Sequence, residues 1–184
     1  MSAPTISDEY RRLNAQLHKD REDYGAGNQT AQWYAMVSQF AQMMKADTIL
    51  DYGCGKNKMG QALAPMMVIP YDPAIPGIDA PPEPHDVVVC LDVLEHIEPE
   101  LLDNVLDDLK RCTLKGVFLT VNMRPAYKTL ADGRNAHLIQ KPIEWWLPKL
   151  MERWDLMAVQ KRGPIEFVFT GQPHPVAKAQ ARAA

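Results

Sequence analysis

The chain has 184 residues, 46% of them hydrophobic, and a formal net charge of −3. This length suffices for one domain with a sizeable core and is too short for two ordinary domains. The slightly negative charge argues against a broad phosphate-binding face, and no apolar run approaches the roughly 18 residues of a membrane span. The N-terminal stretch MSAPTISDEYRR has no apolar signal core, and three cysteines fit reduced thiols better than a disulfide framework. We therefore expect a soluble, cytoplasmic protein.

Two helices are predicted before the first strand. Ser7 can cap a helix that begins at Asp8, because its hydroxyl can accept from the free N–H groups of the first turn. In residues 33–44, apolar side chains recur at steps of three and four, which is typical of a helix packed on a core. Tyr24 and the aromatic residues that open this second helix could also cover a substrate. We assign residues 1–46 to a helical segment that packs on the core as a cap or lid.

Strands and helices then alternate along the chain. Strands are predicted at 48–52, 67–72, 86–91 and 117–121, and helices at 60–66, from 99 to a stop at Gly116, and from Pro142 through Leu150. Two further strands, around 156–160 and 165–169, are expected to form an antiparallel pair at a sheet edge. This alternation predicts right-handed crossovers and helices on both faces of a sheet. We expect an α/β three-layer sandwich whose central sheet is mostly parallel, with an antiparallel closing strand.

One segment interrupts the alternation. The proline-rich stretch PAIPGIDAPPEPH follows the second strand and cannot form a long helix. We place the main domain at 47–172. The tail at 173–184 ends in AKAQARAA, which has no apolar period, so we expect it to be disordered.

Ligands of mostly parallel sheets bind at the carboxyl ends of the strands, so the residues there are informative. The first strand leads into Asp51-Tyr52-Gly53-Cys54-Gly55, where glycines allow a sharp turn and a close approach to main-chain N–H groups. A dinucleotide turn needs a third glycine where Lys58 stands, which weakens a nicotinamide or flavin interpretation. Asp72 follows the second strand at about the offset of twenty residues at which an acid can bind both ribose hydroxyls. Alternatively, Asp72 is an ordinary turn residue before Pro73 and does not bind a ribose.

The third long strand is followed by LDVLEHI. The chain resembles the class I S-adenosylmethionine-dependent methyltransferases in four stretches, which occur in this order: ILDYGCG, YDPA, DVVVCLDVLEHI and LKGVFLTV. NAHLIQKPIEWWLPKLMERWDL is similar to the histidine-containing segment and late helix of the small-molecule subfamily. The resemblance covers roughly Ile49 to Phe169 and implies a Rossmann-like fold with S-adenosylmethionine as cofactor. The chain departs from the family at Asn57, where a small residue is usual, and between Asp72 and Asp86, where the family fits a helix, a strand and another helix.

The resemblance implies a set of cofactor-binding residues. Asp51, Gly53 and Gly55, with Cys54 between the glycines, match the motif at the methionine part, and Asp72 matches the acid that holds the ribose. Asp79 matches a position near the adenine, and Leu91 and Asp92 match the strand end that borders the methionine and the substrate.

Two histidines match positions of the subfamily, His96 after the third long strand and His137 in the later loop. They are the candidate general bases, because histidine titrates near neutrality and a base helps an acceptor that has a proton to lose. The alternatives are structural. His96 could cap or pack beneath the following helix, and His137 could hydrogen-bond within its loop.

Charged residues beside the motifs have less specific interpretations. Asp92, Glu95 and His96 have a spacing that could suit metal ligands, but acids and histidines at a helix start are usually solvated or capping. No metal site is therefore predicted. Lys56 and Lys58 could meet an anionic substrate or the cofactor carboxylate, although such lysines are more often solvated.

The methyl acceptor cannot be read from the sequence. DNA amino-methyltransferases carry a proline-rich motif where this chain has Asp92-Val93-Leu94, so base methylation is disfavoured and no nucleic-acid partner is expected. We expect a methyltransferase that acts on a small molecule, or on a modified group presented by a larger partner. The sequence does not indicate an oligomeric state. Two alternatives remain, a binding protein or subunit that keeps the fold without efficient catalysis, and a nicotinamide oxidoreductase.

Overall fold

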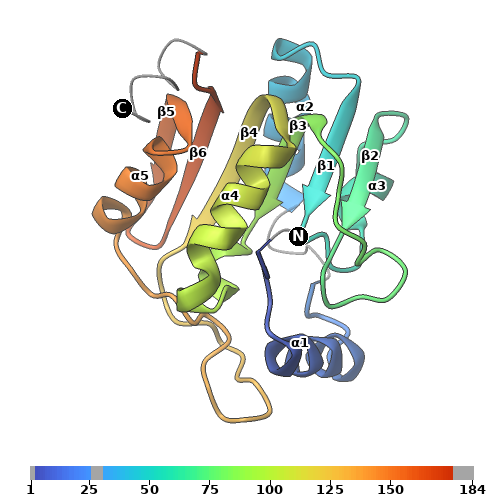
Figure 1. The fold of residues 1–184 in the computed structure, drawn as a ribbon, viewed down its shortest axis with the longest axis vertical. Helices are drawn as coiled ribbons and strands as arrows, with labels where there is room; N and C mark the ends of the chain where they lie inside the picture. The colour runs from blue at the N-terminus through green and yellow to red at the C-terminus, as the bar shows by residue number, and fades with distance from the viewer. Residues whose placement is uncertain (1–2, 26–30, 176–184) are drawn as a thin grey trace.

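The computed structural model describes residues 3–25 and 31–175, and a six-stranded sheet runs through its middle with helices on both sides (Figure 1). The spatial order of the strands is β2, β1, β3, β4, β6, β5. Their bounds are β1 Thr48–Tyr52, β2 Met67–Tyr71, β3 His85–Leu91, β4 Thr113–Asn122, β5 Trp154–Arg162 and β6 Glu166–Pro173. β1 to β4 pair in parallel, whereas β6 runs antiparallel to both β4 and β5. The predicted sheet with an antiparallel closing strand is confirmed, with β5 at the edge.

Two hydrophobic cores lie on opposite faces of the sheet. One holds α4 (Leu102–Cys112) and α5 (Ile143–Met151), and the other holds α2 (Tyr34–Met43) with the short 3₁₀ helix η1 (Ala31–Trp33). Successive strand residues point to opposite faces, so Leu50 belongs to the first core and Ile49 to the second. The expected three-layer sandwich is therefore confirmed.

β4 begins earlier than predicted. Gly116 was expected to end the preceding helical unit, but α4 ends at Cys112 and Gly116 lies inside the strand. A Cβ atom at Gly116 would lie 2.8 Å from Cζ of Phe40 and 3.0 Å from Cε of Met44. The absence of a side chain therefore lets α2 approach the sheet closely at this point.

The helix after the glycine turn also begins earlier than predicted. α3 spans Lys58–Ala62 rather than 60–66, because Asn57 ends the turn in the left-handed conformation, with φ 51°, and the helix starts directly after it. Pro65 disfavours helical geometry at Ala64, so the helix cannot continue to 66.

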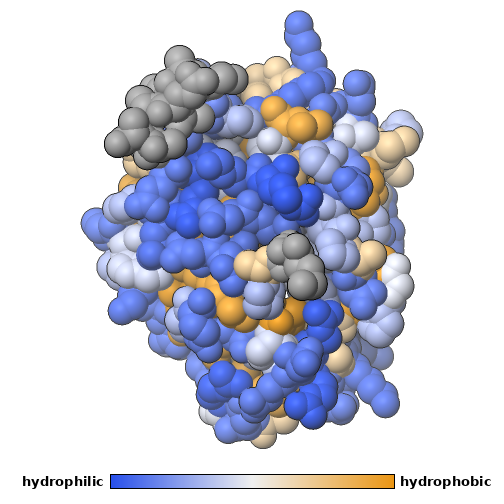
Figure 2. All heavy atoms as spheres, viewed as in Figure 1, coloured by the Kyte–Doolittle hydropathy of each residue, from blue (hydrophilic) through white to orange (hydrophobic). Residues whose placement is uncertain are grey.

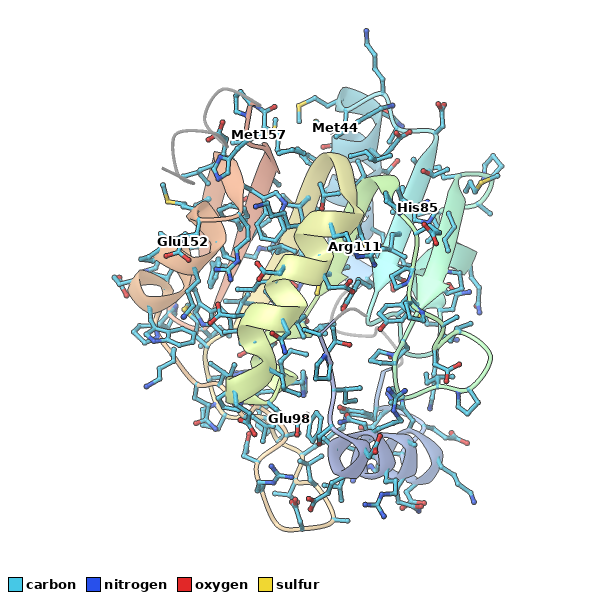
Figure 3. All side chains as sticks on the ribbon, in the orientation of Figure 1. Met44, His85, Glu98, Arg111, Glu152 and Met157 are labelled. Carbon is cyan, nitrogen blue, oxygen red and sulfur yellow. The ribbon has the colours of Figure 1, made fainter. Side chains whose placement is uncertain are left out.

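The passage between β2 and β3 contains no helix or strand in residues 72–84, all of which the structure describes. Asp72 N donates to the carbonyl of Ile78 over 3.0 Å, which closes the first part of this loop. Arg111 of α4, labelled in Figure 3, donates through Nη2 to the carbonyl of Pro82 over 2.7 Å. No strand pairs with the outer side of β2 within the described residues, so β2 forms one edge of the sheet.

The N-terminal helix α1 (Asp8–Asp20) lies beyond the end of the sheet at which β1 and β2 finish (Figure 1). Ser7 caps it as predicted, because its Oγ accepts from Tyr10 N over 3.1 Å. The same hydroxyl donates to Oε1 of Glu98 over 2.6 Å, and Figure 3 shows Glu98 below α4, towards α1. Tyr10 adds a hydrogen bond from its hydroxyl to the carbonyl of His96 over 2.5 Å. These contacts place α1 over the strand ends, whereas α2 packs on a face of the sheet.

The face shown in Figure 2 is mostly hydrophilic, with hydrophobic residues gathered in a band below its middle. Within the described residues, no helix has both the length and the hydrophobicity needed to cross a bilayer. Cys54, Cys90 and Cys112 are free thiols. Residues 176–184 of the expected disordered tail lie outside the described residues, and Pro173 is the last residue of β6.

We predict that Gly116→Val lowers the free energy of unfolding by about 1–3 kcal/mol, because the new side chain overfills the contact with Phe40 and Met44. Urea unfolding followed by circular dichroism measures this change. Leu114→Ala on the same strand is the control, since Leu114 is 57% exposed and its truncation should change stability by less than about 0.5 kcal/mol. A Gly116→Val protein as stable as the wild type would contradict the packing role of this glycine.

Candidate functional site

Two cavities adjoin at the carboxyl end of the parallel strands. The larger has a volume of about 290 Å³ and the smaller about 120 Å³. Five residues line both cavities: Tyr24, Gly25, Gly53, Asp92 and His96. The site thus combines the ends of β1 and β3 with the segment that follows α1, as the rule of strand ends predicts.

The glycine turn after β1 forms the boundary between the cavities. Gly53 has φ 79°, and its N–H donates to the carbonyl of Tyr71 at the end of β2 over 2.8 Å. Cys54 N donates to the same carbonyl over 3.0 Å. A Cβ atom at Gly53 would lie 2.5 Å from Cγ2 of Val93, so both the conformation and the space require glycine here.

Asp51, the penultimate residue of β1, is a buried acid in the wall of the larger cavity, 5% exposed. Its carboxylate has no hydrogen bond or ion pair with any other residue that the structure describes. Burial, reinforced by the nearby charge of Asp72, raises the pKa of Asp51 to about 7. A cationic ligand would therefore find an uncompensated carboxyl group at this position.

Asp72 lines the smaller cavity and fixes the turn from the other side. Its Oδ2 accepts from Gly55 N over 3.1 Å, and its Oδ1 accepts from Ala74 N over 2.9 Å. Nε2 of His18 from α1 lies 4.0 Å from Oδ2. Each oxygen has accepted one hydrogen bond and retains a further lone pair for a ligand.

Asp92, directly after β3, has the strained backbone that often marks functional sites. Its φ is 53°, a left-handed value uncommon outside glycine. Thr120 of β4 holds it there, because its Oγ1 accepts from Asp92 N over 2.9 Å and donates to Asp92 Oδ1 over 2.8 Å. Burial raises the pKa of the Asp92 carboxyl group. The preceding residue, Leu91, also lines the larger cavity.

The two candidate histidines lie together, with ring centroids 4.6 Å apart and planes at 89°. His96 Nδ1 is 2.8 Å from the carbonyl of Ala136, and His137 Nδ1 is 2.6 Å from the carbonyl of Arg124. A carbonyl oxygen only accepts, so each Nδ1 carries the hydrogen and each Nε2 is an acceptor. Burial, aided by His137, lowers the pKa of His96 to about 3, and burial also lowers the pKa of His137. Both rings are therefore neutral near pH 7.

Glu95 is completely buried, contrary to the expectation that it is solvated or capping. It lies in the 3₁₀ helix η2 (Leu94–His96) rather than in a regular α-helix, and its Oε1 accepts from Asn122 N over 3.0 Å. Its Oε2 has no hydrogen-bond partner among the described residues. Burial and the neighbouring charge of Asp92 raise its pKa well above the ordinary range.

The segment after α1 covers the glycine turn. Lys56 N donates to the carbonyl of Gly25 over 2.7 Å, and Lys56 Nζ donates to the carbonyl of Glu22 over 2.7 Å. A Cβ atom at Gly55 would collide with the main chain of Gly25. Tyr24, next in the segment, donates from its hydroxyl to Oδ1 of Asn14 in α1 over 2.8 Å, which fixes its ring between the two cavities.

The structure brings most of the predicted site residues together. The larger cavity is lined by Asp51, Gly53, Cys54, Leu91, Asp92, His96 and His137, and the smaller one by Gly53, Gly55, Asp72, Asp92 and His96. Asp79 lines neither cavity. It is exposed, and its Oδ1 accepts from Gly77 N over 3.1 Å within the proline-rich loop.

Some lining residues were missed by the sequence interpretation. Asn122 ends β4, and Arg124 and Lys128 follow it, so all three lie near the carboxyl end of a central strand. The rule that selected Asp72 and Asp92 could have selected Asn122 as well. The closure of the following loop onto the cavity had no sequence signal, because it depends on hydrogen bonds between distant backbone groups.

The sequence matches no family model and no curated protein. Solved structures give clear fold matches. The N-methyltransferase NodS from Bradyrhizobium japonicum WM9, in complex with S-adenosyl-L-homocysteine, has a TM-score of 0.62 and 13% identity, covering 92% of this chain and 100% of that one. The Burkholderia thailandensis 1,6-didemethyltoxoflavin-N1-methyltransferase has a TM-score of 0.64 and 15% identity, covering 95% and 94%.

A third match, an rRNA methylase from Escherichia coli, has a TM-score of 0.53 and 12% identity, covering 94% of this chain and 79% of that one. These proteins differ in their substrates and share the arrangement of the sheet and its helices. The resemblance seen in the sequence is therefore confirmed at the level of architecture: the chain has the Rossmann-like fold of the class I S-adenosylmethionine-dependent methyltransferases.

Proposed function

We propose that this protein transfers a methyl group from S-adenosylmethionine to a small-molecule acceptor. The observation that carries the proposal is the pair of adjoining cavities at the carboxyl end of the sheet, which meet at the glycine turn and have buried acids in their walls. Similar folds have been crystallised with S-adenosyl-L-homocysteine, which supports the same ligand here.

The residues present fit the cofactor. Asp72 retains acceptor capacity for ribose hydroxyls in the smaller cavity, and the glycine turn allows close approach of a ligand to the main chain. Asp51 and Asp92 are buried carboxyl groups without a cationic partner among the described residues. The positive charges of the cofactor would supply that partner. S-adenosylmethionine supplies an activated methyl group on a sulfonium.

Our proposal gives the protein two tasks in the reaction, orientation and the exclusion of water. Correct orientation alone can lower a barrier by about 7–11 kcal/mol. Tyr24 and Gly25 lie over the cofactor side and would exclude water once both ligands are bound. His96, with a pKa of about 3, would not retain a proton at neutral pH, so Nε2 of His96 and of His137 each keeps a lone pair for a bound ligand.

The larger cavity suits a compact acceptor. Besides its acids it is lined by Lys58, Arg124 and Lys128, and we propose that these cations favour an acceptor with an anionic group. A volume of about 290 Å³ holds a small molecule more readily than a polymer. The free buried thiols Cys90 and Cys112 fit a reducing compartment such as the cytoplasm.

One observation favours the alternative of a binding protein or subunit with weak catalysis. Both Asp72 oxygens already accept main-chain hydrogen bonds, and α1 places His18 within 4.0 Å of one of them. Binding would then depend on movement of α1 or of Tyr24 and Gly25. A protein that binds the cofactor, yet methylates nothing in a screen of cell extracts, would support this alternative.

We predict that Asp72→Ala weakens binding of S-adenosylmethionine at least tenfold, because it removes the acceptor for the ribose. Isothermal titration calorimetry with S-adenosylmethionine, S-adenosylhomocysteine and NAD measures the affinities. Asp79→Ala is the matched comparison, since Asp79 lies on the same loop but outside both cavities.

The outcomes of this titration separate the candidate functions. Micromolar binding of the first two ligands, lost in Asp72→Ala and kept in Asp79→Ala, supports the proposal. Equal losses in both variants would place Asp79 at the adenine, as the family resemblance implies. Absence of wild-type binding to both adenosyl ligands would overturn the proposed function, and binding of NAD alone would indicate an oxidoreductase.

We further predict that binding of the cationic cofactor strengthens as the pH rises from 6 to 8. The raised pKa of Asp51, about 7, means that its carboxyl group is mostly protonated at pH 6 and mostly ionised at pH 8. If the ligand binds only the ionised form, the affinity changes by up to about tenfold. Calorimetry at several pH values measures it. Asp51→Asn should bind more weakly at pH 8 and show a flatter profile, and a wild-type affinity independent of pH would refute the role of Asp51.

A further inference from the structure

We propose that Glu95, His96 and His137 bind a divalent transition-metal ion in the larger cavity. Each residue offers one ligand atom, and these atoms all lie within 4.8 Å of one another. They come from two separate segments, η2 and the loop after β4, and all three residues line the same cavity. Ligands at about 2.0–2.2 Å from an ion lie closer together than this, so the three side chains would tighten around it.

The hydrogen bonds of the two imidazoles prepare them as metal ligands. Each Nδ1–H donates to a main-chain carbonyl, of Ala136 for His96 and of Arg124 for His137. Such bonds fix the tautomer and the ring orientation, as is usual for a metal-binding histidine. Each Nε2 keeps its lone pair.

The environment of Glu95 gives independent evidence for a cation-binding site. The side chain is completely buried, and its Oε2 has no partner among the described residues although Oε1 accepts from Asn122 N. A buried carboxylate without a partner is costly unless it is protonated or meets a cation. No ion pair joins Glu95 to a lysine or arginine within the described residues. A metal ion held by the two imidazoles would neutralise it.

The basic residues nearest to this cluster have other partners. Lys128 Nζ lies 3.1 Å from Oδ2 of Asp23 and 5.6 Å from the centroid of the Tyr24 ring. The guanidinium of Arg124 lies 5.1 Å from the centroid of the Tyr127 ring. Neither side chain forms an ion pair with Glu95, which leaves the neutralisation of its carboxylate to a ligand.

The donor set selects the class of ion. Two imidazole nitrogens and one carboxylate suit zinc, iron(II), cobalt(II) or manganese, whereas magnesium and calcium favour oxygen ligands. Three protein ligands leave at least one position open, as in catalytic zinc sites. An open position here would face the cavity to which the acceptor is assigned.

The role of the ion rests on the proposed function. An ion with an open position would bind a hydroxyl oxygen of the acceptor and lower its pKa, and the released proton would pass to solvent water. The acceptor class that we infer is accordingly a hydroxyl compound rather than an amine.

Metal binding to the full chain can be tested without any methyl donor or acceptor. Protein freed of metal with a chelator is titrated with Co²⁺, followed by visible absorption, and with Zn²⁺, followed by calorimetry and elemental analysis after dialysis. We expect one ion per chain and the visible absorption bands of nitrogen-ligated Co²⁺. Glu95→Gln and His137→Ala should each weaken binding at least tenfold.

His85→Ala is the matched control, because His85 opens β3 at the end opposite the site and Figure 3 shows it far from Glu98. Glu95→Gln keeps the size of the side chain and an acceptor for Asn122 N, so it tests the metal even where His137→Ala unfolds. Near-ultraviolet circular dichroism verifies folding.

The proposal is overturned if the folded wild type binds neither ion, or if Glu95→Gln binds as tightly as His85→Ala. The failure of the metal site and that of the proposed function are distinguishable. Binding of S-adenosylmethionine without metal binding would overturn only the proposed metal site. Metal binding without binding of S-adenosylmethionine would overturn only the proposed methyltransferase function.

Discussion

The concentration of buried carboxyl groups at one end of the sheet is the constraint on which the site depends. β1, β2 and β3 are parallel neighbours, so Asp51, Asp72 and Asp92 emerge at the same edge, and η2 adds Glu95. All except Asp92 are less than 9% exposed, and repulsion among them adds to the cost of burial. Folding tolerates this arrangement through hydrogen bonds to main-chain N–H groups and through protonation. The proposed cofactor and the proposed ion are both cations, and each would relieve a different part of this unfavourable charge.

The site also depends on close packing of the main chain around the glycine turn. The main chain of Gly25 lies against Gly55, and Gly53 fits beneath Val93, so three segments meet where side chains would keep them apart. Hydrogen bonds from Lys56 then hold the segment after α1 against the turn. As a result the proposed adenosine and methyl-transfer regions are two adjoining cavities in the absence of ligand. Tyr24 lines both cavities and is hydrogen-bonded to Asn14 in α1, so a ligand that spanned both would couple its binding to the position of α1.

The architecture and the strand ends could be predicted from the sequence because both follow from periodicity. Alternating apolar segments placed Asp51, Asp72 and Asp92 correctly, since the residue after a buried parallel strand must lie at its carboxyl end. The burial of Glu95 was missed, because burial of a polar group depends on what covers it rather than on its neighbours in the chain. Gly116 was likewise taken for a helix stop, whereas its role is fixed by Phe40 across the sheet. Asp79 matched the family by position, but the shortened loop directs it away from the cavities.

The same shortened loop leaves β2 as an edge strand, and this has a consequence for association between molecules. An exposed edge offers main-chain donors and acceptors that can pair with a strand from another chain and start aggregation. β2 carries Pro70, which has no N–H to donate, and proline within sheets is a common protection of edge strands. Met67, at the start of the strand, is 63% exposed. A proline in the outermost strand thus interrupts the row of main-chain donors that this edge would otherwise offer for intermolecular pairing.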